Sequence, residues 1–470
     1  MRVTRIGTAA IAAALAAGAL APGTASGGIG PGLGTPTFTL ETLTSGATSD
    51  PRVVMQTDTT ALTSFVDYAT RPAGIFHVCQ VPLDATSCAR TTAVTPTDDA
   101  GDMSLVFSGP QLLLANGTAN FTEIFTSGDG GATFGPAVRV SRYANAENVL
   151  PLPDGRLLLV GRGNDSRAND LHAVVVPPDG SGVDTAGFSL PNTDYPGAQR
   201  GVADNGGRYV VLGGGFVSVG STRTQIAYAV YDGSGDPNAI SSWTQSTLPL
   251  QFNDAPNIAG GPSGVVLVAV DADGAVVASK LEGTTFPAPT RIGDPAGKAY
   301  LPNVTQDATG RITATWQVNG VGLRESHSRD GVRWSAPRTL TSDREFDTDI
   351  ATGPAGNGLA VTRAGGRYQA TRIYAAVSLS LKASPAKVEK GKATTLTAKL
   401  TGETGAPLAG RPIALRAGGK TLATKTTNAA GEVTLTTKPS KTTRYRARFA
   451  GTDVLASYTS AAAKVTVTRR

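Results

Sequence analysis

A phrase that recurs about every fifty residues restricts the possible folds of this chain more than any other feature. Each copy has a polar start, an apolar or β-branched stretch, a Gly-containing turn and a second apolar stretch. The copies follow one another at spacings of 46 to 55 residues, and they begin at Asp50, Asp102, Asn148, Arg200, Ala255, Leu301 and Asp347. Units of this length, with about four short strands each, are typical of the blades of a β-propeller. The sequence therefore predicts an all-β, seven-bladed propeller, with six or eight blades as the alternatives.

The last copy leaves room for only three strands before the repeats end near residue 375. Residues 37–43 have the pattern of the fourth strand in other copies, such as residues 134–140 and 334–340. We expect this N-terminal strand to complete the last blade, because closing the ring removes an exposed sheet edge. The predicted propeller thus spans residues 37–375.

The composition excludes several other classes of protein. The chain has 57 glycines and 29 prolines without a Gly-X-Y period, which rules out collagen and disfavours long helices. Its 40% of hydrophobic residues is enough for a packed core and excludes wholesale disorder.

The N-terminus has the pattern of a secretory signal peptide. Arg2 and Arg5 precede an Ala/Leu-rich run, and small residues follow it. The run is too short for a membrane span, and no later segment approaches the ~20 apolar residues that a span needs. We expect a signal peptide at residues 1–25, a flexible leader at 26–36, and a protein that is secreted or associated with the cell wall. A soluble N-terminal helix is the alternative.

The two cysteines, Cys79 and Cys88, flank a short segment whose Pro and Asp suit a hairpin loop. Outside the cell such a pair is expected to form a disulfide. Zinc binding with nearby His77 would need two further ligands, so we expect no metal and no cofactor.

Net charge changes abruptly near residue 376. Residues 377–470 carry ten Lys and seven Arg against four acids, whereas the repeats are mildly acidic. The basic segment, residues 376–470, also has six or seven strands with period-2 alternation, which is the size of an immunoglobulin-like sandwich. Its cations suit either an anionic wall polymer or nucleic acid, or else a solvated face; we favour the solvated face and expect no nucleic-acid partner.

Two turns carry a family signature. One is Ser127, Asp129, Gly131 and Phe134, and the other, a shorter form, is Ser328, Asp330, Gly331 and Trp334. These residues match the Asp-box pattern, and the repeats therefore resemble the sialidase-like (Asp-box, or BNR-repeat) propeller superfamily. The resemblance implies a structural role: the Asp accepts hydrogen bonds from its own turn, and the box lies far from any reaction centre.

The basic segment resembles bacterial Ig-like adhesion and spacer modules. The residues that carry this resemblance are Thr427–Val433 and Tyr445 with Phe449, Ala450 and Gly451. The segment contains no cysteine and so no disulfide, which also fits the bacterial modules.

Sialidase-like enzymes clamp a carboxylate with three Arg and use a Tyr–Glu pair and an Asp. The Arg-Ile-Pro motif of the family is absent here, and Arg52 is the residue whose position corresponds to it most nearly. The sequence also contains no convincing Tyr–Glu pair. We therefore assign no catalytic residue. Four acids occupy every second position on the approach to the last inner strand: Asp343, Glu345, Asp347 and Asp349. They either form a carboxylate site on one face or are solvated acids at a turn and strand edge.

The starts of the inner strands should meet at one end of the central channel. The residues expected there are Arg52, Asp102, Asn148, Arg200, Asn257, Asn303 and Asp349. Their donors and acceptors suit sugar hydroxyls or a single carboxylate. We expect a monomer that binds a glycan or a cell-surface partner with this face. The alternatives are a divergent exo-glycosidase, a purely structural wall spacer, and residues that only satisfy one another around a water-filled channel.

Overall fold

The computed structural model shows a chain that is nearly all β. It describes residues 38–42, 51–68, 73–163, 171–190, 195–203, 207–215, 225–248, 250, 252, 254, 256–293, 299–341, 346–353, 356–364, 367–374, 377–402, 407–451, 455 and 457–468. Within these residues the one helical element is the short 3-10 turn Ile240–Ser242, which precedes β17. The expected signal peptide and leader, residues 1–36, lie outside the described residues.

Seven four-stranded antiparallel sheets are present in the described part of the chain between residues 38 and 373. We number them 1 to 7 in chain order. Sheet 1 contains β2 (Arg52–Thr57), β3 (Thr60–Asp67), β4 (Ile75–Pro82) and β5 (Arg90–Val94). Sheet 2 contains β6 (Asp102–Ser108), β7 (Gln111–Gly117), β8 (Thr122–Ser127) and β9 (Val138–Ser141). Sheet 3 contains β10 (Ala144–Pro151), β11 (Leu157–Gly163), β12 (Leu171–Val176) and β13 (Phe188–Leu190).

The next three sheets repeat this meander. Sheet 4 contains β14 (Tyr195–Ala203), β15 (Tyr209–Gly215), β16 (Gln225–Tyr231) and β17 (Trp243–Leu248). Sheet 5 contains β18 (Asn257–Ala259), β19 (Val266–Val270), β20 (Val276–Lys280) and β21 (Thr290–Arg291). Sheet 6 contains β22 (Ala299–Gln306), β23 (Ile312–Val318), β24 (Gly322–Ser328) and β25 (Arg338–Thr341).

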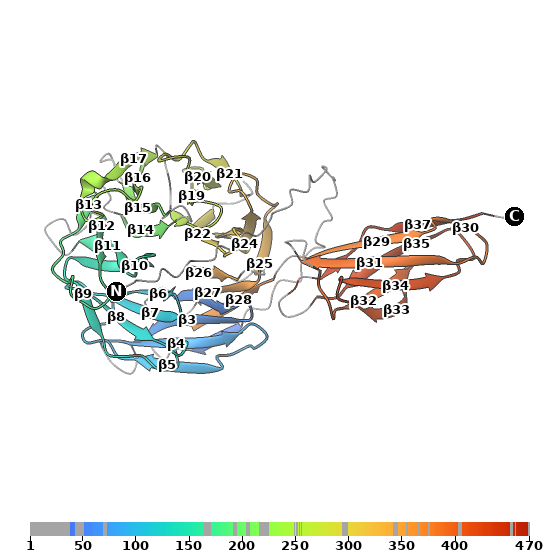
Figure 1. The fold of residues 1–470 in the computed structure, drawn as a ribbon, viewed down its shortest axis with the longest axis horizontal. Helices are drawn as coiled ribbons and strands as arrows, with labels where there is room; N and C mark the ends of the chain where they lie inside the picture. The colour runs from blue at the N-terminus through green and yellow to red at the C-terminus, as the bar shows by residue number, and fades with distance from the viewer. Residues whose placement is uncertain are drawn as a thin grey trace, which may run out of the picture. The chain divides into compact units, whose positions relative to one another are not determined.

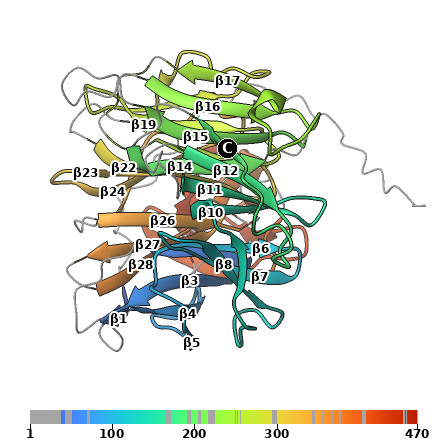
Figure 2. The ribbon, with the colours of Figure 1, turned by 90° about the vertical axis from the view of Figure 1, so that its left-hand side faces the viewer.

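Sheet 7 is the only one of these sheets assembled from both ends of its region. It contains β26 (Phe346–Thr352), β27 (Gly358–Ala364), β28 (Arg367–Ile373) and β1 (Phe38–Thr42). The N-terminal strand β1 pairs antiparallel with β28, with Phe38 opposite Ala370 and Thr42 opposite Arg367. Figure 2 shows the four strands in succession. The pairing expected for the N-terminal segment is therefore present.

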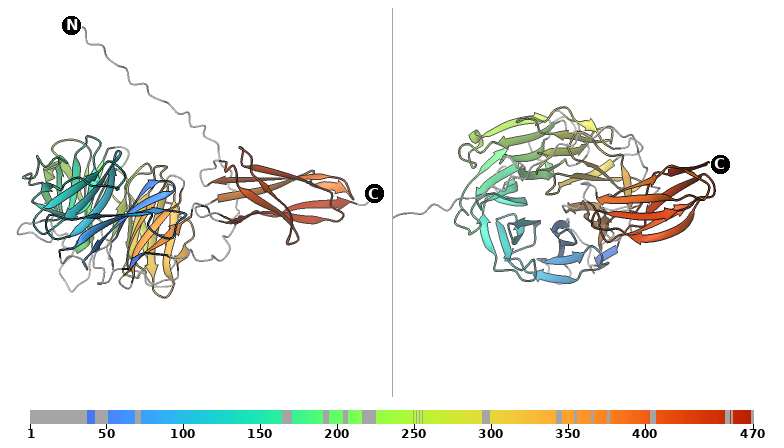
Figure 3. Two further views of the ribbon diagram at one scale, coloured as in Figure 1. Left: turned by 90° about the horizontal axis from the view of Figure 1, so that it is seen from below. Right: turned by 45° about the vertical axis from the view of Figure 1, so that its right-hand side comes forward.

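The sheets lie around a common centre (Figures 1 and 3). The first strand of each sheet is innermost and contacts the first strand of the next, and β26 contacts β2, which closes the ring. Four-stranded meanders arranged in this way are what the blades of a β-propeller look like.

Hydrophobic residues fill the spaces between neighbouring sheets, since each sheet is buried on both faces. On β11, for example, Leu157 and Leu159 pack against sheet 2, whereas Leu158 and Val160 pack against sheet 4. This explains why the second strands read as continuous apolar runs instead of alternating.

One contact between sheets is polar instead. Thr313, Thr315 and Gln317 alternate along β23 and are fully buried, and they share a face with Leu323, which packs against sheet 7. The two Thr hydroxyls and the Gln317 amide have no hydrogen-bond partner among the described residues. The same holds for three hydroxyls in sheet 7, those of Thr348, Thr352 and Thr362. We call this set of six residues the polar seam between sheets 6 and 7.

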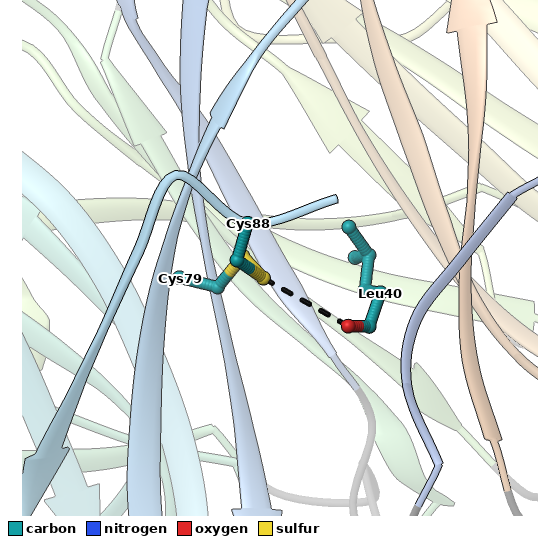
Figure 4. Close-up of a disulfide and its surroundings, with 3 residues drawn as sticks. All are labelled: Leu40, Cys79 and Cys88. Carbon is teal, nitrogen blue, oxygen red and sulfur yellow. Dashed lines mark hydrogen bonds between the residues drawn. A yellow bond between two sulfur atoms is a disulfide. The ribbon is translucent and has the colours of Figure 1, made fainter. Parts of the chain in front are cut away.

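Cys79 in β4 forms a disulfide with Cys88, with a Cα–Cα distance of 5.6 Å. The Cys88 Sγ lies 3.9 Å from the carbonyl oxygen of Leu40 in β1 (Figure 4), and this is a packing contact because a disulfide sulfur carries no hydrogen. Cys79 and Leu40 belong to one apolar cluster with Val361 and Tyr368 of sheet 7. The disulfide therefore lies where the last and first sheets meet.

Residues 377–468 form two further sheets. The three-stranded sheet contains β29 (Val377–Ser384), β31 (Thr394–Gly402) and β34 (Glu432–Thr437). The six-stranded sheet contains β30 (Lys387–Glu389), β37 (Ala463–Thr468), β35 (Thr443–Phe449), β32 (Pro412–Ala417), β33 (Lys420–Thr426) and β36 (Tyr458–Thr459). Leu379, Leu400, Leu415 and Phe449 pack between the two sheets in one apolar cluster. This is the layered arrangement of a β-sandwich.

No helix in the described part of the chain is both long enough and apolar enough to cross a bilayer.

Candidate functional site

The predicted site residues lie on the innermost strands of the seven sheets. Because these strands run in the same sense around the ring, their starts define one end of it, which we call the head end. The positions are Arg52 on β2, Asp102 on β6, Asn148 on β10, Arg200 on β14, Asn257 on β18, Asn303 on β22 and Asp349 on β26. The side chain of Arg200 lies outside the described residues, as do the side chains of Asp343, Glu345 and Asp347.

Several of these side chains tie one inner strand to the next. The Asp349 carboxylate accepts a hydrogen bond from the backbone N–H of Val53, at 2.8 Å, across the junction of sheets 7 and 1. Asn148 likewise accepts from the N–H of Gly201, at 3.0 Å, between sheets 3 and 4. An inner strand has a neighbouring strand on one side only, so these side chains satisfy backbone groups that the ladder leaves free.

Donors make the same kind of link. Asn303 Nδ2 donates to the carbonyl of Thr348, at 2.7 Å, and Arg52 Nε donates to the carbonyl of Met103, at 2.9 Å. Asn257 Nδ2 donates to Asn303 Oδ1, at 3.1 Å. The structure thus brings these residues together as a belt around the centre of the ring, and the amides of the belt are largely occupied by hydrogen bonds within the protein.

Asp102 is not part of this belt. Its place in sheet 2 is taken by Ser104, whose hydroxyl accepts from the N–H of Val149 at 3.2 Å. Asp102 lies two residues nearer the head end, opposite Gly117, and its carboxylate is available for other contacts.

The carboxylate of Asp102 takes part in a charged group that links sheets 2 and 3. Arg162, near the end of β11, donates from an Nη to Asp102 Oδ2 at 3.0 Å, and its Nε lies 3.3 Å from Glu147 Oε1. The Glu147 side chain is 7% exposed, while those of Arg162 and Asp102 are 36% and 39% exposed. One guanidinium therefore bridges a buried carboxylate and a half-exposed one.

A β-bulge places Glu147 in this position. Ala146 pairs with Gly161 and Asn148 with Val160, so Glu147 is an extra residue without a partner on β11. Bulges redirect a side chain out of the regular alternation and are frequent at functional sites. We call Arg52, Asp102, Glu147 and Arg162 the head-end cluster; Arg52 belongs to it because its guanidinium is bonded to Met103, next to Asp102.

Sequence reasoning missed Glu147, Arg162 and Ser104. The available signal for Glu147 was a broken alternation in Ala144–Val149, where a polar pair replaces the expected single polar residue. Arg162 could have been noticed as a charge within a second strand, separated by one residue from the apolar run of that strand.

The two turns that match the Asp-box pattern lie at the other end of their sheets, because β8 and β24 run away from the head end before each turn begins. Asp129 Oδ1 accepts from the N–H groups of Ala132 and Thr133, both at 2.9 Å, and Oδ2 accepts from Thr133 Oγ1 at 2.7 Å. These bonds, that from the Thr133 hydroxyl above all, hold the pKa of Asp129 well below its usual value. Gly131 has a φ of 82°, which only glycine adopts readily.

The second box repeats this geometry. Asp330 Oδ1 accepts from the N–H groups of Val332 and Arg333, at 2.9 and 2.7 Å, and from Ser328 Oγ at 3.1 Å. Partial burial raises the pKa of Asp330, but the hydrogen bonds from Arg333 and Val332 outweigh this and leave the pKa below its usual value. Trp334 packs against the apolar cluster between sheets 5 and 6, and Phe134 packs between sheets 1 and 2.

Both boxes also join their sheet to the preceding one. Thr92 Oγ1 of sheet 1 donates to the carbonyl of Gly131 at 2.7 Å, and Lys280 Nζ of sheet 5 donates to the carbonyl of Asp330 at 3.0 Å. A deprotonated Asp whose oxygens are occupied by its own turn has no proton to donate, so the boxes have the contacts of structural elements.

No group of three His, Cys, Asp or Glu side chains that could hold a metal ion forms among the described residues. Asp271, in a sequence that resembles the start of a calcium loop, instead accepts from the N–H groups of Asp273 and Ala275, at 3.0 and 2.8 Å, in the hairpin between β19 and β20.

No protein-family model matches the sequence, and the comparison with curated proteins found no match. Among solved structures, one similar chain is a protein of unknown function from Dyadobacter fermentans, with 13% identity and a TM-score of 0.42 over 72% of this chain and 98% of that one. The Aleuria aurantia lectin has 12% identity and a TM-score of 0.40 over 72% and 93% of the two chains. The extracellular domain of a putative hybrid two-component system from B. thetaiotaomicron has 9% identity and a TM-score of 0.44 over 93% and 59%. Similarities of this degree carry no functional inference.

Proposed function

We propose that this chain is a secreted bacterial protein that binds a glycan or a cell-surface partner at the head end of a seven-bladed propeller. The proposed propeller belongs to the sialidase-like, Asp-box superfamily, and residues 376–470 serve as an Ig-like spacer or adhesion module. The observation that carries the binding role is the head-end cluster, in which Arg162 bridges Asp102 and Glu147.

The chemistry of this cluster suits a sugar. A guanidinium offers forked N–H donors and a carboxylate offers paired acceptors, which together match the adjacent hydroxyls of a pyranose. The buried contact with Glu147 fixes the Arg162 side chain before a ligand arrives, so less conformational entropy is lost on binding. The exposed portions of Asp102 and Arg162 are then free to meet the ligand.

Secretion is supported by the pattern of residues 1–25 and by the disulfide between Cys79 and Cys88, since such bonds persist outside the cytoplasm.

The pair of carboxylates favours a second candidate, a divergent exo-glycosidase of the sialidase-like kind. Glycoside hydrolysis uses two carboxyl groups, one as an acid and one as a nucleophile or base. In this alternative Glu147 and Asp102, which Arg162 bridges, would be the two carboxyl groups.

The test is glycan-array binding by the full secreted chain, alongside a panel of fluorogenic glycosides. The double variant Arg52→Gln, Asp102→Asn should lose binding while its melting temperature stays within a few degrees of the parent. Unchanged binding in this variant would overturn the proposed site. Turnover of a glycoside that is lost in Glu147→Gln would instead favour the glycosidase.

The matched control is a second Asp/Arg pair at the opposite end of sheet 3. Arg156 Nε donates to Asp154 Oδ2 at 2.8 Å in the turn between β10 and β11. The variant Asp154→Asn, Arg156→Gln removes the same charges and should leave glycan binding unchanged.

A further inference from the structure

The outward face of the six-stranded sheet in residues 377–468 carries an uninterrupted row of cations. Along β35, Arg444, Arg446 and Arg448 alternate with the inward-facing Tyr445, Ala447 and Phe449, as the exposed and buried pattern of the strand shows. The register adds two neighbours, because Lys464 of β37 is paired with Arg444 and Arg416 of β32 is paired with Arg446. We call these five residues the basic face.

No acidic side chain balances this charge on the same strands. The sequences of β32, β33, β35 and β37 contain no Asp or Glu. Of the acids in the described part of this region, Glu432 pairs with Lys399 on the three-stranded sheet, and Glu389 lies on the edge strand β30. Arg444, Arg446, Arg448 and Lys464 are all exposed.

Like charges at directly opposed positions of a sheet are destabilising. Two such pairs on adjacent strands, Lys464–Arg444 and Arg416–Arg446, are therefore unfavourable for folding alone. A bound polyanion would remove this repulsion between the cations. On an ordinary solvated face, by contrast, cations and acidic side chains are interspersed, as on most protein surfaces.

The spacing of the cations indicates the shape of the anion. Alternate residues on a strand lie about 6.6–6.8 Å apart, and neighbouring strands about 4.8 Å apart. A flexible linear polymer with one phosphodiester per short polyol unit can place successive phosphates along Arg444, Arg446 and Arg448.

The described strands β32, β35 and β37 present no exposed aromatic side chain on which a nucleobase could stack. The aromatic residues of β35, Tyr445 and Phe449, are buried in the sandwich core, and the neighbours of the arginines across the sheet include Ala414 and Thr459. Proteins that bind single-stranded nucleic acid combine cations with exposed aromatic platforms. We propose that the basic face binds a base-free, linear polyol phosphate of the kind that decorates cell walls. This inference is independent of the function proposed for the ring of sheets.

Titration of the full chain with a synthetic oligo(glycerol phosphate), at several salt concentrations, tests the proposal. The triple variant Arg444→Gln, Arg446→Gln, Arg448→Gln should weaken binding at least tenfold at low salt. The slope of log K against log [salt] should fall by about two, since each neutralised phosphate on a single strand contributes roughly 0.7. The variant should keep its melting temperature, because the three side chains are exposed and mutually repulsive.

A matched control removes the same net charge elsewhere in this region. Lys382, Lys392 and Lys438 are exposed, on β29 or in connections outside the basic face. Their triple Gln variant should change the affinity less than threefold. Equal losses in the two triple variants would overturn the proposal, because they would show a response to net charge alone. Absence of binding by the parent, or tighter binding of a single-stranded oligonucleotide of equal charge, would also overturn it.

Discussion

At the scale of single residues, Arg162 and the buried carboxylate of Glu147 form an ion pair. Removing one partner of a buried ion pair costs about 3–5 kcal/mol, and the partial exposure of Arg162 reduces this. We expect Arg162→Ala to lower the free energy of unfolding by about 1–2 kcal/mol in urea titrations. Adding Glu147→Gln should recover part of the loss, because the buried position then carries no charge. Additive effects of the two changes would show that the pair does not interact.

The pKa of Asp129 predicts how the stability of the folded protein depends on pH. Its pKa is lowered in the folded protein by hydrogen bonds within its turn, that from Thr133 foremost. A carboxyl whose folded pKa lies below its unfolded value of about 3.9 stabilises the fold above that pH, and this contribution is lost as the pH falls toward the folded pKa. Asp129→Asn should therefore be less stable than the parent at pH 7, and the difference in urea midpoints should shrink below about pH 4. A difference that stays constant down to pH 2.5 would contradict this.

At the scale of elements, the polar seam between sheets 6 and 7 has buried polar side chains where the other junctions between sheets have mostly apolar ones. The hydroxyls of Thr315 and Thr362 are buried without a hydrogen-bond partner among the described residues. Replacing an unpaired buried hydroxyl by a methyl group removes its desolvation cost, so Thr315→Val and Thr362→Val should each raise the free energy of unfolding by about 1 kcal/mol. Thr339→Val, at an exposed position of β25, is the control and should be neutral. A loss of stability in both seam variants would contradict the prediction.

Strands and turns were readable from the sequence because each depends on local chemistry. Apolar runs such as Leu157–Val160 and turns with Gly155 or Gly131, whose φ values are positive, mark strands and hairpins without knowledge of their neighbours. The bulge at Glu147 was not readable, because it depends on which residues of β10 and β11 face each other. The repeat alignment therefore placed Asp102 where the ring has Ser104, and it missed Arg162.

At the scale of the whole molecule, the last sheet of the ring is completed by a strand from the far end of the ring's own sequence region. Antiparallel pairing with β28 holds β1 in the last sheet. Leu40 is the described residue of β1 that packs into the cluster joining sheets 7 and 1, beside the disulfide. The sequence suggested this closure because three strands at one end and one at the other add up to a full unit.

Leu40→Asp tests the closure, because it places a charge in an apolar cluster without altering any other strand. Loss of the buried leucine alone costs about 2–5 kcal/mol, so β1 should detach instead of burying the carboxylate. Hydrogen exchange at residues 367–370, which face β1, should then speed up at least a hundredfold, while the inner strands stay protected. Thr39→Asp is the matched control, since Thr39 is exposed on the same strand and edge strands tolerate charge there. If the amide hydrogens of β28 exchange as slowly in both variants as in the parent, β1 does not close the ring. If exchange speeds up and aggregation appears in Leu40→Asp alone, coverage of the β28 edge by β1 keeps the ring closed and soluble.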